Sequence, residues 1–215
     1  TGLPFRLHPN TFAALSAHDE LVAAHGAMAT LAGSLMKIAN DIRWLGSGPR
    51  CGLGELVLPA NEPGSSMMPG KVNPTQCEVM TMVAVQVHGN NSAVAFAGSQ
   101  GNFELNVFKP LIISHVVQSL TLLKESCRSF ADFLVKDLDI DRTRIDYYVK
   151  NSLMLVTAFA SVIGYDKAAA VARKAYEQNM NLREACVSLG FLTAEECDAI
   201  LKPEAMVHPW KYPDD

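Results

Sequence analysis

Several features that mark other protein classes are scarce in this sequence of 215 residues. Positive charge is in the minority, because 18 lysines and arginines stand against 22 acidic residues, which gives a formal net charge of −4. A protein without a basic excess is poorly suited to hold a polyphosphate backbone, so we expect no nucleic-acid partner. A small anionic substrate would have to be held by a few local positive groups.

Paired cysteines and long hydrophobic runs are also missing. The five cysteines are widely spaced, odd in number and without a C-x-x-C pair. They indicate free thiols in a reducing compartment, with neither a disulfide framework nor a metal site. The apolar stretch 79–87 is interrupted by Thr81 and Gln86. It is too short to cross a bilayer, which needs about 20 residues, so we expect no membrane partner.

The sequence does contain apolar residues at helical spacing over most of its length. Steps of three and four between them predict an all-α fold built around long helices. A first long helix is expected from its N-cap Asn10 to about Gly46. Another should cover 102–136 and bend at Pro110, because a proline ring removes a backbone hydrogen bond and clashes one turn back.

Between these two, a further long helix is expected to begin at Pro74. Asn73 would be its N-cap and Gln76 its third residue, in the manner of a capping box. The following run, 79–87, is apolar on almost every side of a helix. Such a helix must be buried on most sides, which predicts that helices of other subunits cover part of it.

Glycine and proline are concentrated in residues 46–70. This stretch holds six glycines and four prolines, a density of helix breakers that predicts a long loop. Within it, Glu55–Leu58 could form a short extended piece. Loops of this length that lack regular structure are usually functional or disordered.

Beyond residue 137 the long periodic segments give way to short ones. Thr193 and Glu196 form a good capping-box start for one of them. We place a domain boundary near residue 142, with a helical-bundle domain carrying a serine loop over 1–142 and a small helical domain over 143–215. The short helices are expected at about 142–150, 153–163, 167–179, 182–189 and 193–201.

The segment 64–74 joins a flexible loop to a helix N-terminus. Gly64 and Gly70 allow unusual backbone angles, two serine hydroxyls stand near one end, and the Lys71 ammonium stands near the other. The free N–H groups of a first helical turn, together with the helix dipole, favour an anion there. The arrangement is suited to hold a carboxylate and to present a hydroxyl to it.

The same residue types also have an ordinary structural explanation, since Gly, Ser, Pro and Asn are common in turns. The functional interpretation is favoured because the string resembles the fumarate-lyase superfamily signature, G-S-x-x-M-x-x-K-x-N. Five fixed positions within ten residues are far more specific than a lone glycine-rich pattern. The matching residues are Gly64, Ser65, Met68, Lys71 and Asn73.

The resemblance extends over essentially the whole chain and is to class II fumarase in particular. That family implies a reversible hydration of fumarate to L-malate, a step of the tricarboxylic acid cycle. It also implies an all-α long-helix bundle followed by a small helical domain, with no metal and no organic cofactor. The segments that carry the resemblance are 35–54, 61–78, 101–108, 152–158 and 163–169.

The resemblance implies a role for each matching residue of the signature region. Ser65 is expected to be the catalytic base, which as an alkoxide removes a proton from malate and leaves an aci-carboxylate intermediate. Ser66 is expected to contact the substrate. Lys71 and Asn73 would bind the carboxylate on which charge accumulates, with the Val72 backbone between them, as preorganised donors do.

Glu78 resembles the acid that orients a histidine belonging to another subunit. In the family the site is shared among three subunits of a homotetramer, and its acid histidine comes from segments that we expect to precede Thr1 in a longer protein. We therefore expect this chain alone to be inactive. No catalytic role is carried onto the histidines present, which are expected to be packed or surface residues: His8, His18, His25, His88, His115 and His208.

Two other functions stay open beside a fumarate hydratase acting on a small dicarboxylate. An aspartate ammonia-lyase shares the fold and the serine loop, although 74–78 follows the fumarase pattern more closely. A non-catalytic helical assembly module is the alternative of another class. We expect a cytoplasmic protein, or a mitochondrial one if the source is eukaryotic.

Overall fold

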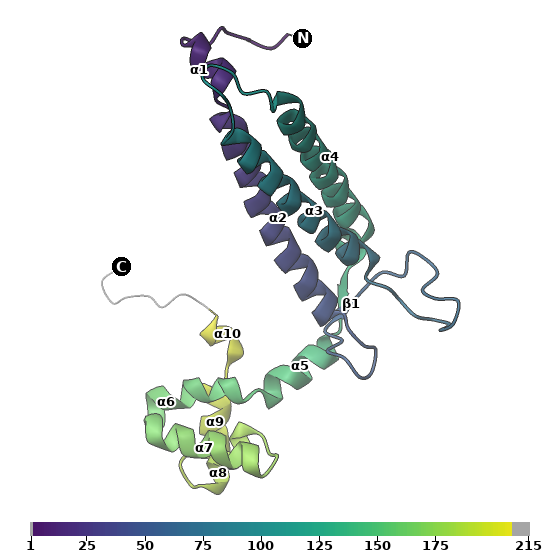
Figure 1. The fold of residues 1–215 in the computed structure, drawn as a ribbon. Helices are drawn as coiled ribbons and strands as arrows, with labels where there is room; N and C mark the ends of the chain where they lie inside the picture. The colour runs from purple at the N-terminus through teal and green to yellow at the C-terminus, as the bar shows by residue number, and fades with distance from the viewer. Residues whose placement is uncertain (1, 208–215) are drawn as a thin grey trace. The chain divides into compact units, whose positions relative to one another are not determined.

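Figure 1 shows the computed structural model of the chain, which describes residues 2–207. Its contacts divide into two compact units, Thr1–Asp141 and Arg142–Asp215, beside the boundary expected near residue 142. The described residues contain one two-stranded sheet, and helices make up most of the rest. The predicted all-α fold is therefore confirmed.

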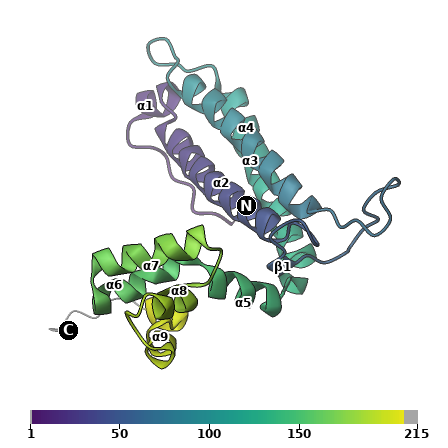
Figure 2. The same ribbon diagram turned by 90° about the horizontal axis from the view of Figure 1, so that it is seen from below.

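The first unit is a bundle of three long helices, α2 (Asp19–Leu45), α3 (Thr75–Gly98) and α4 (Lys109–Phe133). They lie side by side in both views (Figures 1 and 2). Ala32 and Ala39 of α2 are fully buried, and their small side chains let neighbouring helices approach closely. The residues packed around these two alanines include Met80, Val83, Val87, Leu123 and Phe130.

The prediction of one continuous first helix is wrong, although its N-cap is confirmed. The Asn10 side chain accepts hydrogen bonds from the first turn of α1 (Thr11–Ser16), which then ends. The Leu15 carbonyl accepts instead from the Asn106 backbone N–H at 3.0 Å and from the Lys109 ammonium at 2.7 Å. Tertiary hydrogen bonds thus take an acceptor that a continuous helix would use, and α2 starts afresh.

The start of α3 also differs from the prediction. Thr75 is its first residue, Pro74 occupies the N-cap position, and no side chain caps the first turn. The amide of Asn73 donates instead to the Gly64 carbonyl. Asn73 is therefore not a helix cap, because it closes the preceding loop.

Pro110 does not bend a helix, and the expected helix over 102–136 is wrong at its start. The helix α4 begins at Lys109, so Pro110 lies in the first turn, where its missing N–H costs no intrahelical hydrogen bond. The preceding turn is organised by the buried Asn106. Its amide donates to the carbonyls of Ala97 and Gln100, and its carbonyl accepts from the Phe108 N–H.

The glycine-rich region after α2 is a loop, as predicted, and it contains the expected extended piece. Strand β1 (Leu56–Val57) pairs antiparallel with β2 (Asp139–Ile140), which follows α4 and the short 3-10 helix η1 (Val135–Asp137). Two backbone hydrogen bonds of 2.9 Å extend the connection, from Glu55 N–H to the Leu45 carbonyl and from Asp141 N–H to the Glu55 carbonyl. The first part of the loop is thereby anchored.

The second unit consists of short helices around its own core, seen in Figure 2. Phe159, Val171 and Cys186 are fully buried in that core. The predicted capping box at Thr193 is confirmed, and Asn181 forms a second one. The elements are α5 (Arg142–Asn151), η2 (Leu153–Val156), α6 (Thr157–Ile163), α7 (Tyr165–Glu177), α8 (Leu182–Ser188), α9 (Ala194–Ile200) and α10 (Pro203–Met206).

Much of the bundle's apolar surface is open to solvent in the single chain. On α3, for example, Met82 and Val85 are exposed by 64% and 62%. By length and composition alone α2 could also cross a membrane, a test that the core helix of a soluble bundle passes equally well. Because α2 packs along α3 and carries the buried, hydrogen-bonded His25, we read it as a bundle helix.

Candidate active site

The signature residues form a loop whose ends meet. A Cβ on Gly64 would lie 1.5 Å from the Lys71 carbonyl oxygen, so the backbone crosses itself at a place where only glycine fits. Two residues after Lys71, the side-chain amide of Asn73 donates a hydrogen bond to the Gly64 carbonyl. The close approach of Gly64 and Lys71 fixes the base of the loop, and residues 65–70 form its tip.

The two serines lie on the tip of this loop. The Ser65 hydroxyl oxygen accepts a 3.2 Å hydrogen bond from the Met67 N–H, and the Ser66 side chain is exposed. The Lys71 N–H donates to the Met68 carbonyl at 3.3 Å, which turns the chain back toward α3. Figure 1 shows the segment as a long excursion between β1 and α3, beside the end of the bundle.

A cavity of about 560 Å³ lies where the loop returns to α3. Four of the six predicted site residues line it, and the two serines do not. The opposite wall is α2, which contributes Asn40, Arg43 and Trp44. The predicted residues at the cavity are Lys71, Val72, Asn73 and Glu78.

The α2 wall was not assigned to the site from the sequence. Asn40, Arg43 and Trp44 stand at positions i, i+3 and i+4, so they share one face at the end of the helix. That spacing, immediately before the glycine-rich loop, is the sequence signal that could have found them. A second cavity of about 570 Å³, lined by 68–72 and 46–49 among others, includes Lys71 and Val72 as well.

The first cavity, of about 560 Å³, is lined by an ion pair between Arg43 and Glu78. Arg43 Nη2 lies 3.1 Å from Glu78 Oε1, and both side chains are roughly half exposed. Arg43 is in the last turn of α2 and Glu78 is in the first turn of α3, so each charge also has the sign that its helix dipole favours. Lys71 lines the same cavity as a second positive charge. The arrangement can bind a small anion near a carboxylate that is held in place.

The thiol beside this ion pair should be unreactive. Burial raises the pKa of Cys77 to about 11, and the nearby Arg43 charge offsets only part of this effect. At pH 8 we expect iodoacetamide to label buried Cys77 on the order of 100-fold more slowly than exposed Cys51, because the thiolate is the nucleophile. Mass spectrometry of the labelled peptides measures both rates, and denaturant should abolish the difference. Equal rates in the folded chain would contradict the packing of the first turn of α3.

The histidines of the bundle make structural contacts outside this cavity. His25 is fully buried, with Nε2 2.9 Å from the Ser119 hydroxyl and Nδ1 3.1 Å from the side-chain Oδ1 of Asn91. His115 Nδ1 contacts the buried Asn90 at 3.0 Å. Within residues 2–207 no histidine lines the cavity, and His208 lies outside the described residues.

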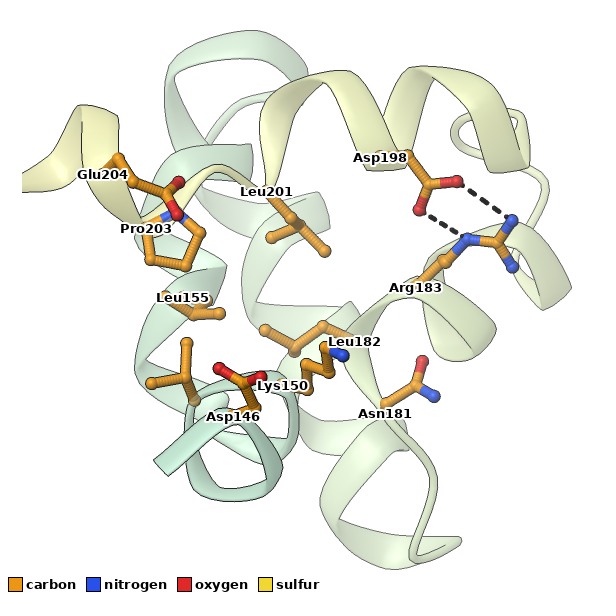
Figure 3. A pocket seen from close by; sticks show the side chains of 11 residues that line it. Asp146, Lys150, Leu155, Asn181, Leu182, Arg183, Asp198, Leu201, Pro203 and Glu204 are labelled. Atoms are coloured by element: carbon orange, nitrogen blue, oxygen red, sulfur yellow. Dashed lines mark hydrogen bonds and ion pairs between the residues drawn. The ribbon is translucent and has the colours of Figure 1, made fainter. Parts of the chain in front are cut away.

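The second unit has a cavity of its own, shown in Figure 3. It measures about 420 Å³, and leucines and a proline form its apolar wall. At its rim Arg183 donates two hydrogen bonds to Asp198, at 2.7 and 3.1 Å, and that carboxylate raises the pKa of the Arg183 guanidinium. None of the predicted site residues lies there. We regard the Arg183–Asp198 pair as a link between α8 and α9.

Comparisons with known proteins bear on this site. A family model described as lyase matches residues 1–89, and one described as fumarase C C-terminus matches 155–208. The class II fumarate hydratase of Thermosynechococcus vestitus is 65% identical over 207 residues, which cover 96% of this chain. Over 96% of its length the chain is similar to the C-terminal part of a class II fumarase. The mitochondrial fumarate hydratase of Dictyostelium discoideum is 59% identical over 211 residues, or 98% of the chain.

A solved class II fumarase shows the same fold. The crystal structure of the Schistosoma mansoni enzyme matches 96% of this chain with a TM-score of 0.92 and 48% sequence identity. The chain spans 44% of the length of each of the two curated relatives and 43% of that crystallised chain. The relatives named fumarate hydratase include bacterial and mitochondrial proteins.

Proposed function

We propose that the protein containing this chain is a fumarate hydratase that interconverts fumarate and L-malate. The observation that carries the proposal is the cavity that gathers Lys71, Val72, Asn73 and Glu78 beside the signature loop. Two positively charged residues, Lys71 and Arg43, and one carboxylate, that of Glu78, line this cavity, which suits a small dicarboxylate better than a neutral substrate. The 65% identity to a named class II fumarate hydratase supports the same reaction.

Ser65 is the proposed base of this reaction. Its alkoxide takes the proton from the malate carbon next to a carboxylate, and the electron pair moves into that carboxylate to give the aci-carboxylate. Loss of the hydroxyl as water, with a proton from an acid, then leaves fumarate. Lys71 and Asn73 hold the carboxylate that gains charge, because preorganised donors stabilise charge best where water is excluded.

The loop must close for these roles to be combined. Ser65 and Ser66 lie on the tip, outside the cavity lining, whereas the proposed carboxylate-binding residues line the cavity. We propose that substrate draws the tip over the cavity, which expels water and strengthens the electrostatic interactions inside. Ser66 would then contact the substrate beside Ser65.

The remaining parts of the site are proposed to come from other subunits of a homotetramer. The exposed apolar residues of α3 and the other bundle helices support burial against further helices, since large apolar patches usually mark interaction sites. Glu78 would orient the acid histidine of a neighbouring subunit. We propose a cytoplasmic protein, or a mitochondrial one in a eukaryote.

A graft provides the decisive test. The chain replaces the matching 207 residues of the Thermosynechococcus fumarate hydratase, so that the rest of a complete enzyme surrounds it. We expect this grafted enzyme to form fumarate from malate, measured by ultraviolet absorbance, and to be inactive on aspartate. The chain alone should show no turnover.

Other outcomes of the same test point elsewhere. Ammonia release from aspartate without malate turnover would favour the ammonia-lyase alternative. A graft that forms a tetramer by light scattering, yet is silent on both substrates, would contradict the proposed activity and favour an assembly module. Turnover by the chain alone would contradict the proposal that its site is incomplete.

A further inference from the structure

We propose that Arg43 is a positioning residue of this site, acting through Glu78. The inference rests on the proposed function, in which Glu78 orients the acid histidine. It starts from the ion pair at the cavity, where Arg43 Nη2 binds Glu78 Oε1 at 3.1 Å. Glu78 is the one carboxylate that lines this cavity, and Arg43 binds it, which indicates more than an incidental surface position.

The ion pair occupies only one of the two carboxylate oxygens of Glu78. Only Oε1 is bound to Arg43, and within residues 2–207 Oε2 has no hydrogen-bond or ion-pair partner. A carboxylate can accept through both oxygens. Arg43 can therefore hold the group at one oxygen while the other accepts a hydrogen bond from an imidazole N–H brought to the cavity. Held in this way, the carboxylate loses little orientational freedom when the histidine binds.

The ends of the two helices that carry Arg43 and Glu78 are anchored by backbone hydrogen bonds or burial, which suits a positioning role. Arg43 lies in the last turn of α2. Just after it, the Gly46 N–H donates to the Ile42 carbonyl and the Leu45 carbonyl accepts from the Glu55 N–H. On the other side, Glu78 belongs to the first turn of α3, next to buried Cys77. Both partners thus stand on helices, which hold a side chain more accurately than a loop does. The ion pair joins the α2 wall of the cavity to the α3 wall.

The charge of Arg43 adds a second effect. It compensates the negative charge of Glu78 in a cavity that must also accept a dianion. The other charged residues that line the cavity with Glu78 are Arg43 from α2 and Lys71 from the loop, and Lys71 is the one proposed to bind substrate. With Arg43 engaged by Glu78, the Lys71 ammonium stays available for the substrate carboxylate. Loss of Arg43 would let Glu78 compete for Lys71.

The test is a double-mutant cycle in the grafted enzyme, with Arg43→Met, Glu78→Gln and both together. Methionine keeps an unbranched stem and removes the charge. We expect Arg43→Met to lower kcat by about 10- to 100-fold, a part of the 10²- to 10⁴-fold contribution of acid–base catalysis, with a KM change of less than about threefold. In the Glu78→Gln background the same substitution should have no further effect on kcat, because the partner is already lost.

Two further variants separate positioning from stability. Arg43→Lys keeps a positive charge and one donor, so we expect it to recover most of kcat. Arg183→Met removes a similarly exposed arginine–carboxylate pair from the second unit, and it should leave kcat unchanged. Thermal unfolding should change little in either methionine variant, because exposed ion pairs contribute little to stability.

The outcomes are distinct. Wild-type kcat in Arg43→Met, or a loss that is as large in the Glu78→Gln background as in the parent, would overturn the inference while the proposed function stands. A lysine variant no better than the methionine one would also count against it. A folded, tetrameric graft that is inactive without any substitution would overturn the proposed function, and this inference with it.

Discussion

Replacing Ser65 with alanine in the grafted enzyme is expected to lower kcat for malate by about 100- to 10,000-fold, the usual contribution of a positioned base. KM should change little, because the hydroxyl acts on the proton that is transferred and the carboxylate-binding residues remain in place. Steady-state kinetics followed by ultraviolet absorbance give both constants. The loop should keep its shape, since the single hydrogen bond of the Ser65 hydroxyl is a 3.2 Å contact within the tip.

Controls for this substitution lie in the same chain. Ser66→Ala removes the neighbouring hydroxyl, which is proposed to contact substrate, and should raise KM more than it lowers kcat. Ser92→Ala removes an exposed hydroxyl from the middle of α3, where it donates to the His88 carbonyl, and should leave both constants unchanged. A Ser65→Ala enzyme with more than about a tenth of the parent kcat would exclude Ser65 as the base.

Substituting Gly64 with alanine should damage the enzyme about as severely, for a steric reason. The new methyl group would lie 1.5 Å from the Lys71 carbonyl oxygen, a backbone atom that cannot swing aside as a flexible side chain could. The two chain segments that cross at the base of the loop must separate, which displaces Ser65 and Lys71 together. Because a shift of about 1 Å at a catalytic group can cost about 100-fold, we expect a loss of that size in kcat/KM.

Gly70 provides the matched comparison. It has a φ of 79°, which disfavours a side chain, but a Cβ there would meet nothing within 4 Å. Gly70→Ala should therefore cost about 1–2 kcal/mol of backbone strain without displacing the crossing, and activity should largely survive. Equal losses of kcat/KM in the two alanine variants would mean that strain, rather than the crossing, governs the loop.

The local sequence predicted the elements whose hydrogen bonds are local. Asn10 caps α1, and Thr193 and Glu196 form their capping box, because each needs only residues three positions apart. The glycine and proline density similarly predicted the loop after α2. The resemblance to class II fumarase predicted six site residues in that loop and at the start of α3, and the structure brings four of them to one cavity.

Two of the errors arise because partners outside the local helical pattern compete for the groups involved. Asn73 has the chemistry of a helix cap, yet its amide is used by the Gly64 carbonyl. The first helix ends early because Asn106 and Lys109, about 90 positions away, bind the Leu15 carbonyl. The sequence did not identify Arg43 as a site residue, because its partner Glu78 lies 35 positions later in the chain.

The crossing between Gly64 and Lys71 also bears on how this site can change. A segment that is tied at its own base can vary at its tip without disturbing the helices on either side. Substitutions at Ser66, Met67 or Pro69 could thus alter what the tip contacts while Lys71 and Glu78 keep their places at the cavity. The loop is in this sense an exchangeable part, and a library restricted to those three positions would be the economical route to a new substrate preference.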